Sequence, residues 1–104
     1  MALRKIQKEV DVWIKQYKIG YFKPHENLAR LPEEVGEVAR EVNHKFGPKK
    51  KKLTESESDL GEELADIIFT VVCLANSLKI DLDKSFDKVM RKVNIRDKER
   101  YEKK

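Results

Sequence analysis

Apolar residues recur every three or four positions through most of the chain, and this helical period is the feature that most constrains the fold. The apolar stripes run from Leu3 to Tyr17, from Leu28 to Phe46, from Leu60 to Leu78 and from Leu82 to Val93. Turn-forming residues are scarce, with four glycines and three prolines in 104 residues, which disfavours a hairpin-rich β fold. We therefore expect an all-α fold, an antiparallel helical bundle of about four helices, formed by a single domain over residues 1–104.

Glycine and proline predict where these helices begin and end. Gly20 should end the first helix, and Gly47 should end the second. Pro32 lies inside the second stripe, where it predicts either a new helical segment or, as the preferred outcome, a kink. Asp81 or Asp83 is expected to cap the fourth helix.

The small size of the chain bears on assembly and location. One core of about 100 residues is modest, so we expect dimerisation, or a tetramer, to complete the bundle. Cys73 is the single cysteine and can form no disulfide within the chain, which is typical of a reducing compartment. The longest apolar stretch, residues 67–75, is far shorter than the ~20 residues of a membrane span, and the sequence begins without a secretion-type apolar segment. We expect a cytoplasmic protein that does not contact membranes.

A narrow acidic stripe interrupts the otherwise apolar third helix. It comprises Asp59, Glu62, Glu63 and Asp66. A helix that is apolar around most of its circumference packs on several sides, so the stripe should line a groove. The second helix offers Glu34, Glu37 and Glu41 on one face, because these residues are three and four positions apart.

Carboxylates that converge in a groove repel one another and need a cation. Divalent ions that prefer oxygen ligands fit best, with Mg²⁺ as the expected ion and Mn²⁺ as a substitute, since no cluster of cysteine and histidine suits zinc. The alternative is that both glutamate-rich faces are simply solvated.

The order of these carboxylates resembles a known family signature. Glu33-Glu34-Val35-Gly36-Glu37 is followed after 25 residues by Glu63-Leu64-Ala65-Asp66. This pair resembles the E-E-x-x-E and E-x-x-D motifs of the MazG-like, all-α nucleoside triphosphate pyrophosphohydrolases, in particular the short single-domain bacterial members. Residues 29–31, 39–44 and 72–78 are similar to the family as well, and the resemblance covers about residues 13–100.

The resemblance implies a reaction and assigns its catalytic residues. It implies that Glu34, Glu37, Glu63 and Asp66 bind Mg²⁺, with Glu33 in an outer-shell or water-orienting role. The implied substrate is a nucleoside triphosphate, cleaved between the α and β phosphates to the monophosphate and pyrophosphate. House-cleaning of nucleotide pools is the role that such an activity would serve.

Basic residues near the C-terminus are candidates for the phosphate contacts. Lys92, Arg96 and Arg100 are spaced i, i+4 and i+8, which places them on one face of a continuous helix. The alternative is a solvated basic helix end, which the helix dipole favours. The run from Lys49 to Lys52 is interpreted either as a solvated loop or as a lid over phosphates.

Two further residues are candidates for contact with the nucleobase. Trp13 belongs to the apolar stripe of the first helix, so core packing is the preferred interpretation and stacking on a base the alternative. Asn76 stands among apolar neighbours, and it either bonds the edge of a base or joins two helices.

Three other functions fit the sequence less well than the hydrolase that the resemblance implies. Glu41 and His44 form an E-x-x-H unit typical of di-iron carboxylate bundles, but the third helix has no histidine. A non-enzymatic helical interaction protein or nucleic-acid-binding protein would rest on the basic tail and the net charge of +4 alone, without a groove-reading motif, so we do not expect nucleic acid as a partner. A P-loop mechanism is excluded because the sequence lacks a G-x-x-x-x-G-K-[ST] motif.

Overall fold

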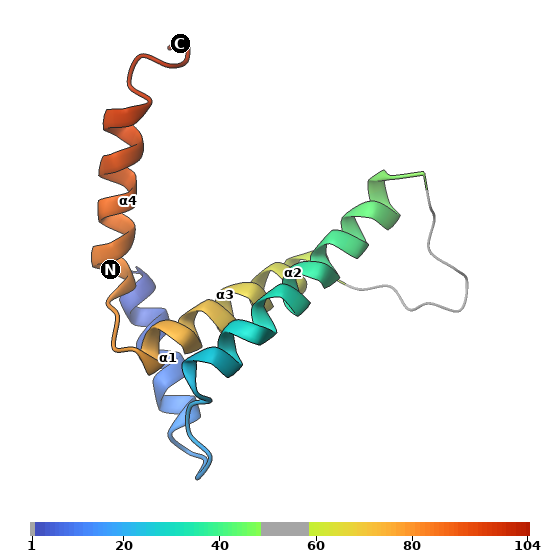
Figure 1. Cartoon of the computed structure of the whole chain (residues 1–104), viewed down its shortest axis with the longest axis vertical. Coiled ribbons are helices and arrows are strands. Elements are labelled where there is room, and N and C mark those ends of the chain that lie inside the picture. The colour runs from blue at the N-terminus through green and yellow to red at the C-terminus, as the bar shows by residue number, and fades with distance from the viewer. Residues whose placement is uncertain (1, 49–58) are drawn as a thin grey trace.

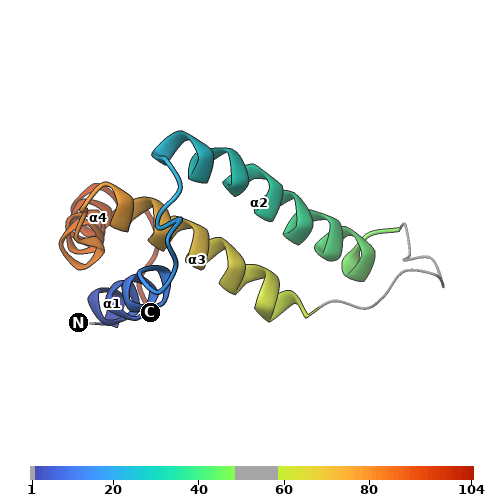
Figure 2. The ribbon, with the colours of Figure 1, turned by 90° about the horizontal axis from the view of Figure 1, so that it is seen from below.

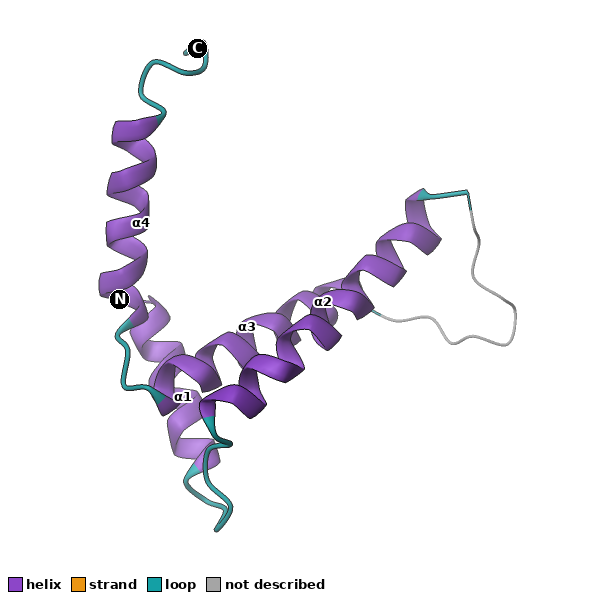
Figure 3. Cartoon of the chain, in the orientation of Figure 1, coloured by secondary structure: helices purple, strands orange, loops and turns teal. Residues whose placement is uncertain are grey.

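The computed structural model describes residues 2–48 and 59–104, and within these ranges the regular structure is entirely α-helical (Figure 3). The helices are α1 (Ala2–Ile14), α2 (Pro24–Phe46), α3 (Leu60–Ser77) and α4 (Leu82–Arg96). The all-α prediction is confirmed. The predicted lid, Lys49 to Lys52, lies outside the described residues.

The helices of one chain form two diverging arms (Figure 1). α2 and α3 lie side by side and antiparallel, α1 packs against α3, and α4 packs against α1 (Figure 2). The radius of gyration is 17.5 Å, against about 13 Å for a compact chain of this length. One copy therefore does not close the four helices into a bundle.

The apolar stripe predicts an α-helix as far as Tyr17, but the segment that follows Ile14 is wound more tightly than an α-helix. α1 ends at Ile14, and the amides of Gln16 and Tyr17 then bond carbonyls three residues back, at 3.3 and 3.1 Å. Gly20 has a φ of +59°, a left-handed conformation that glycine adopts without steric cost. Gly20, the predicted end of the first helix, thus forms the turn toward α2, six residues beyond the end of α1.

α2 passes through Pro32 as one helix. Of the two outcomes predicted for this proline, the start of a new segment is therefore wrong. Pro24 occupies the first helical turn, where its missing N–H costs nothing.

The two candidate caps of α4 have different roles. Asp81 caps α4, since Oδ1 accepts hydrogen bonds from the amides of Asp83 and Lys84 at 3.0 and 3.3 Å. The Asp83 carboxylate instead accepts from the amides of Leu3 and Arg4, at 3.2 and 3.0 Å. Asp83 therefore satisfies the first turn of α1 and fastens α4 to it.

The buried apolar side chains belong to the central helix, α3. Among the residues that the structure describes, the buried apolar ones are Val72, Cys73 and Ala75. Many large apolar side chains on α2 and α4 are exposed: Leu28, Val35, Val42, Phe46, Phe86, Val89, Met90 and Ile95. Within residues 2–48 and 59–104, no helix is both long and apolar enough to cross a membrane.

Candidate active site

Two helices that are adjacent in space bring together three of the predicted carboxylates. Glu34 and Glu37 come from α2 and Glu63 comes from α3, and one oxygen of each lies within 4.8 Å of the other two. The antiparallel pairing of α2 and α3 places the two sequence motifs side by side (Figure 2). These three residues are called the carboxylate cluster below.

The environment of Glu63 shows the electrostatic cost of this arrangement. Its pKa is raised from the ordinary value of 4.5, first because its carboxyl hydrogen-bonds to that of Glu37, then because of burial and the negative charges of Glu37, Asp66 and Glu34. Glu63 Oε2 is buried and lacks a hydrogen-bond partner among the described residues. A buried oxygen without a partner, beside two further carboxylates, fits the all-oxygen ligand set of a hard divalent cation.

The remaining acidic candidates lie outside the cluster. Asp66 is exposed one turn further along α3, and its backbone carbonyl accepts a hydrogen bond from Thr70 Oγ1 at 3.0 Å. Glu33 is exposed on α2 and is not part of the cluster. Glu41 and His44, the residues of the di-iron alternative, are also outside it.

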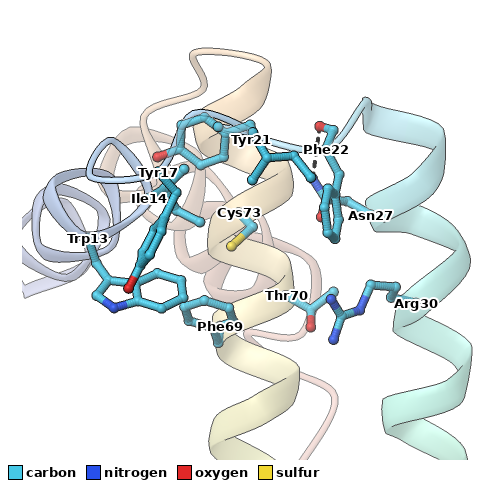
Figure 4. A pocket seen from close by; sticks show the side chains of 12 residues that line it. Trp13, Ile14, Tyr17, Tyr21, Phe22, Asn27, Arg30, Phe69, Thr70 and Cys73 are labelled. Atoms are coloured by element: carbon cyan, nitrogen blue, oxygen red, sulfur yellow. Dashed lines mark hydrogen bonds between the residues drawn. The ribbon is translucent and has the colours of Figure 1, made fainter.

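A cavity of about 400 Å³ lies between α1, α2 and α3 (Figure 4). Its walls are mainly aromatic and apolar, with polar groups on one side. The lining residues used below are Trp13, Tyr21, Asn27, Arg30, Phe69 and Thr70.

Arg30 connects the cavity to the cluster. Its guanidinium lies 3.9 Å from Glu34 Oε1 and 5.9 Å from the centre of the Phe22 ring. A ligand seated in the cavity would therefore reach the carboxylates past the positive charge of Arg30.

Trp13 lies on the wall of this cavity, so the preferred interpretation as a core residue is wrong for the single chain. Its side chain is 49% exposed, and it makes edge contacts with Tyr17 and Phe69 at centroid distances of 5.2 and 6.0 Å. An aromatic ring held in this way can stack on a flat ligand.

Asn76 joins α1 to α3, which is the second of its two predicted roles. Its Nδ2 donates to the Gln7 carbonyl at 2.9 Å and to the Tyr21 hydroxyl at 3.0 Å, and its Oδ1 accepts from Gln7 Nε2 at 2.9 Å. Tyr21 in turn donates to Asp11 Oδ1 at 2.6 Å. The polar atoms of Asn76 are thus committed to a network that holds the helices together.

The predicted phosphate contacts are not brought to the cluster within one chain. α4 leads Lys92 and Arg96 away from the α2–α3 pair (Figure 1), and Arg96 bonds Asp97 at 3.1 Å. Arg100 lies beyond the end of α4, so the predicted continuous face i, i+4, i+8 is interrupted before it.

The cavity contains polar residues that the sequence analysis missed. Arg30 is four residues before Glu34, and that spacing was sufficient to place it on the same face of α2. Asn27 had no such signal, because its burial depends on the turn before α2, where its Nδ2 donates to the Phe22 carbonyl.

Comparison with known proteins agrees with this geometry. Residues 22–101 match the family model described as the MazG nucleotide pyrophosphohydrolase domain. The chain is 53% identical over 103 residues to the protein YpjD of Bacillus subtilis (strain 168), covering 99% of this chain and 93% of that protein.

Two solved structures are similar as well. The crystal structure of the candidate pyrophosphatase YPJD from Bacillus subtilis aligns with a TM-score of 0.79 and 53% identity, covering 88% of this chain and 94% of that one. The structure of the Bacillus-conserved MazG protein, described as a nucleotide pyrophosphohydrolase, aligns with a TM-score of 0.75 and 48% identity, covering 88% of each chain.

The fold and the carboxylate cluster define an all-α protein with a candidate metal site. The extent of the family match then identifies the chain as a member of the MazG nucleotide pyrophosphohydrolase family.

Proposed function

We propose that this enzyme is a Mg²⁺-dependent hydrolase of nucleoside triphosphates that cleaves between the α and β phosphates. The observation that carries the proposal is the carboxylate cluster, in which three oxygens lie within 4.8 Å and a buried oxygen of Glu63 has no partner among the described residues. Glu34, Glu37 and Glu63, with Asp66 beside them, would hold the ion. Mn²⁺ shares this preference for oxygen ligands and would substitute.

Bound Mg²⁺ would supply positive charge to the phosphate oxygens and lower the pKa of a water molecule. The residues of the chain then bind and orient the substrate. Arg30 stands between cavity and cluster, where it can hold a phosphate oxygen while the base occupies the cavity and stacks on Trp13.

In the proposed reaction, water attacks the α phosphorus and a carboxylate of the E-E-x-x-E motif accepts its proton. Glu33 precedes Glu34 on α2 and is not part of the cluster, which suits a role in orienting that water. The bond between the α phosphorus and the bridging oxygen breaks, so the products are a nucleoside monophosphate and pyrophosphate. Such a reaction would serve the house-cleaning of nucleotide pools.

The products and the metal requirement test this proposal. Each common ribo- and deoxyribonucleoside triphosphate is incubated with the protein and Mg²⁺, and pyrophosphate and phosphate are measured separately. Pyrophosphate release that chelation abolishes is expected. Phosphate as the product, or turnover that persists in excess chelator, contradicts the proposal, and bound iron with a visible absorbance band would favour a di-iron centre instead.

We also propose that a second copy completes the site. Few apolar side chains of the described residues are buried within one copy, whereas α2 and α4 present large exposed apolar residues that a helical bundle would cover. Because α4 diverges from its own carboxylate cluster, its Lys92 and Arg96 would serve the cluster of the partner copy. A dimer or a tetramer satisfies both requirements.

Mixing two inactive variants tests this shared site. One variant carries Glu37→Gln, and the other carries Lys92→Ala with Arg96→Ala. If each site combines residues of two copies, a mixed dimer holds one intact site of two. Co-refolding equal amounts of the variants makes about half of the dimers mixed, so it restores roughly a quarter of the original activity. A monomer by light scattering, or no recovery on mixing, contradicts the shared site.

A further inference from the structure

Gln7 is a buried polar residue of α1 whose side chain reaches the start of α4. The residue is 8% exposed. Its Oε1 accepts a hydrogen bond from the Leu82 amide at 2.9 Å, and its Nε2 donates to the Ile80 carbonyl at 2.7 Å and to Asn76 Oδ1 at 2.9 Å. Because a backbone amide can only donate and a carbonyl can only accept, these contacts fix the orientation of the Gln7 side chain.

These bonds tie α1 to the turn that leads into α4. Leu82 is the first residue of α4, and its amide is one of the four that have no partner within the helix. Asp81 bonds the next two amides, so the Gln7 side chain supplies the acceptor that the cap leaves out. Asp83 is bonded to the first turn of α1, and Gln7 lies further along that helix. α4 is therefore attached to α1 at two separate points.

The direction of α4 depends on these contacts at its base. No residue of α4 is buried within one copy, and the helix leads away from the α2–α3 pair (Figure 1). Its 15 residues span about 20 Å, so a rotation by about 10° at Leu82 would move Arg96 by roughly 3–4 Å. A displacement of this size breaks a hydrogen bond between Arg96 and a phosphate.

The bonds of Asn76 separate this attachment from the wall of the cavity. Asn76 Nδ2 donates to the Gln7 backbone carbonyl at 2.9 Å and to the Tyr21 hydroxyl at 3.0 Å. Neither of these two bonds uses the Gln7 side chain. A substitution that removes only the side-chain amide of Gln7 therefore leaves the contact with Tyr21 in place and removes the contacts with the base of α4.

We infer that Gln7 is a positioning residue that fixes the direction of α4 and thereby brings Lys92 and Arg96 to the carboxylate cluster of the partner copy. The inference rests on the proposed function, in which each site combines the cluster of one copy with α4 of the other. Gln7 then acts on the site that contains the cluster of the partner copy, and not on the site that contains the cluster of its own chain.

Mixed dimers test this inference, because their one intact site takes its cluster from one chain and its α4 from the other. The chain with Lys92→Ala and Arg96→Ala supplies the cluster, and the chain with Glu37→Gln supplies α4. Gln7→Met keeps the length of the side chain and removes its amide. This substitution is added to one chain or to the other, and pyrophosphate release is measured after co-refolding.

The two placements of Gln7→Met should have different effects. In the chain that supplies α4, the substitution should lower the restored activity about tenfold or more, because the phosphate contacts are misplaced. In the chain that supplies the cluster, it should change the restored activity by less than about twofold. Each mixed dimer carries the substitution once, so a general loss of stability would lower both activities equally. Equal losses in the two placements, or no loss in either, would overturn the inference.

Gln16→Met is the matched control. Gln16 is exposed and makes no side-chain hydrogen bond among residues 2–48 and 59–104, so its substitution should leave the restored activity unchanged in either chain. If Gln7→Met does not fold, Gln7→Glu takes its place. Its carboxylate keeps an acceptor for the Leu82 amide but cannot donate to the Ile80 carbonyl, and the same difference between the two placements is expected.

The outcomes also separate this inference from the proposed function. If the mixture without Gln7→Met recovers no activity, the shared site is refuted, and the role of Gln7 with it. If the mixture recovers activity that Gln7→Met lowers equally from both chains, the role of Gln7 is refuted, whereas the shared site and the hydrolase stand.

Discussion

The carboxyl groups of Glu37 and Glu63 come from different helices, yet an oxygen of one lies within 4.8 Å of an oxygen of the other. Their proximity raises the pKa of Glu63 in the folded chain. In the absence of a cation, this contact between two acids opposes folding at neutral pH.

Removing the charge of Glu63 should therefore stabilise the metal-free protein. A carboxyl group whose folded pKa is raised contributes stability below its ordinary pKa of 4.5, and this contribution is lost as the pH rises through the folded value. In chelator, Glu63→Gln should melt at a higher temperature than the original protein at pH 7, and the difference should vanish below about pH 4.5. A constant difference across this pH range would contradict the electrostatic cause.

Mg²⁺ should raise the melting temperature of the original protein more than that of Glu63→Gln, whereas chelator favours the variant. A ligand that binds only the folded state raises its stability by mass action, so Mg²⁺ should raise the melting temperature of the original protein. The melting temperature of Glu63→Gln should rise much less on addition of Mg²⁺. Equal gains in both proteins would place the ion elsewhere.

Asp83 should contribute more to the free energy of unfolding than its position on a charged helix suggests. Asp83→Ala removes the acceptor for two amides of α1 and should cost about 1–2 kcal/mol of unfolding free energy. Asp87→Ala is the matched control, because within residues 2–48 and 59–104 Asp87 makes only an exposed ion pair with Arg91 and should change stability by less than about 0.5 kcal/mol. Urea titrations of both variants measure the difference, and equal costs would mean that Asp83 does not cap α1.

Tyr21 should lose its proton at a higher pH than an ordinary tyrosine. Burial and the hydrogen bond to Asp11 raise its pKa to about 12 from 10.0. Its contribution to stability is present below pH 10 and is lost as the pH rises through about 12. The ultraviolet absorbance of tyrosinate measures this titration. Tyr21→Phe should remove the part of the absorbance change that occurs near pH 12.

The same substitution has a second expected effect. Tyr21→Phe leaves Asn76 and Asp11 without their shared partner and should cost about 1–3 kcal/mol, whereas Tyr17→Phe, on a half-exposed ring, should cost less than about 0.5 kcal/mol. A late titration that persists in Tyr21→Phe would assign the raised pKa to another group.

The helical period predicted the fold class because it depends on local geometry. The apolar stripes gave the four helices, and the spacing of Glu34 and Glu37 placed both on one face of α2. Pairing with Glu63 was also predictable, since two acidic faces on adjacent helices have a common physical cause in a shared cation.

Contacts set by tertiary packing were harder to predict. From the sequence, the Asn76 amide is equally suited to bond the edge of a base or to join two helices. Only the position of Gln7 on α1 decides between these roles. Arg100 was placed on a helix because its spacing fits, but α4 ends at Arg96 and Asp97 follows as its cap. The burial of Asn27 depends on a turn whose path the sequence does not reveal.

The central claim is that the carboxylate cluster performs the hydrolysis, and pyrophosphate release by Glu37→Gln tests it most directly. With Mg²⁺ and a saturating triphosphate, this variant should lose activity by about a hundredfold or more, because one ligand of the ion is neutralised. Glu9→Gln, which removes an exposed carboxylate on α1, should retain the original rate. Undiminished pyrophosphate release by a folded Glu37→Gln protein would contradict the account.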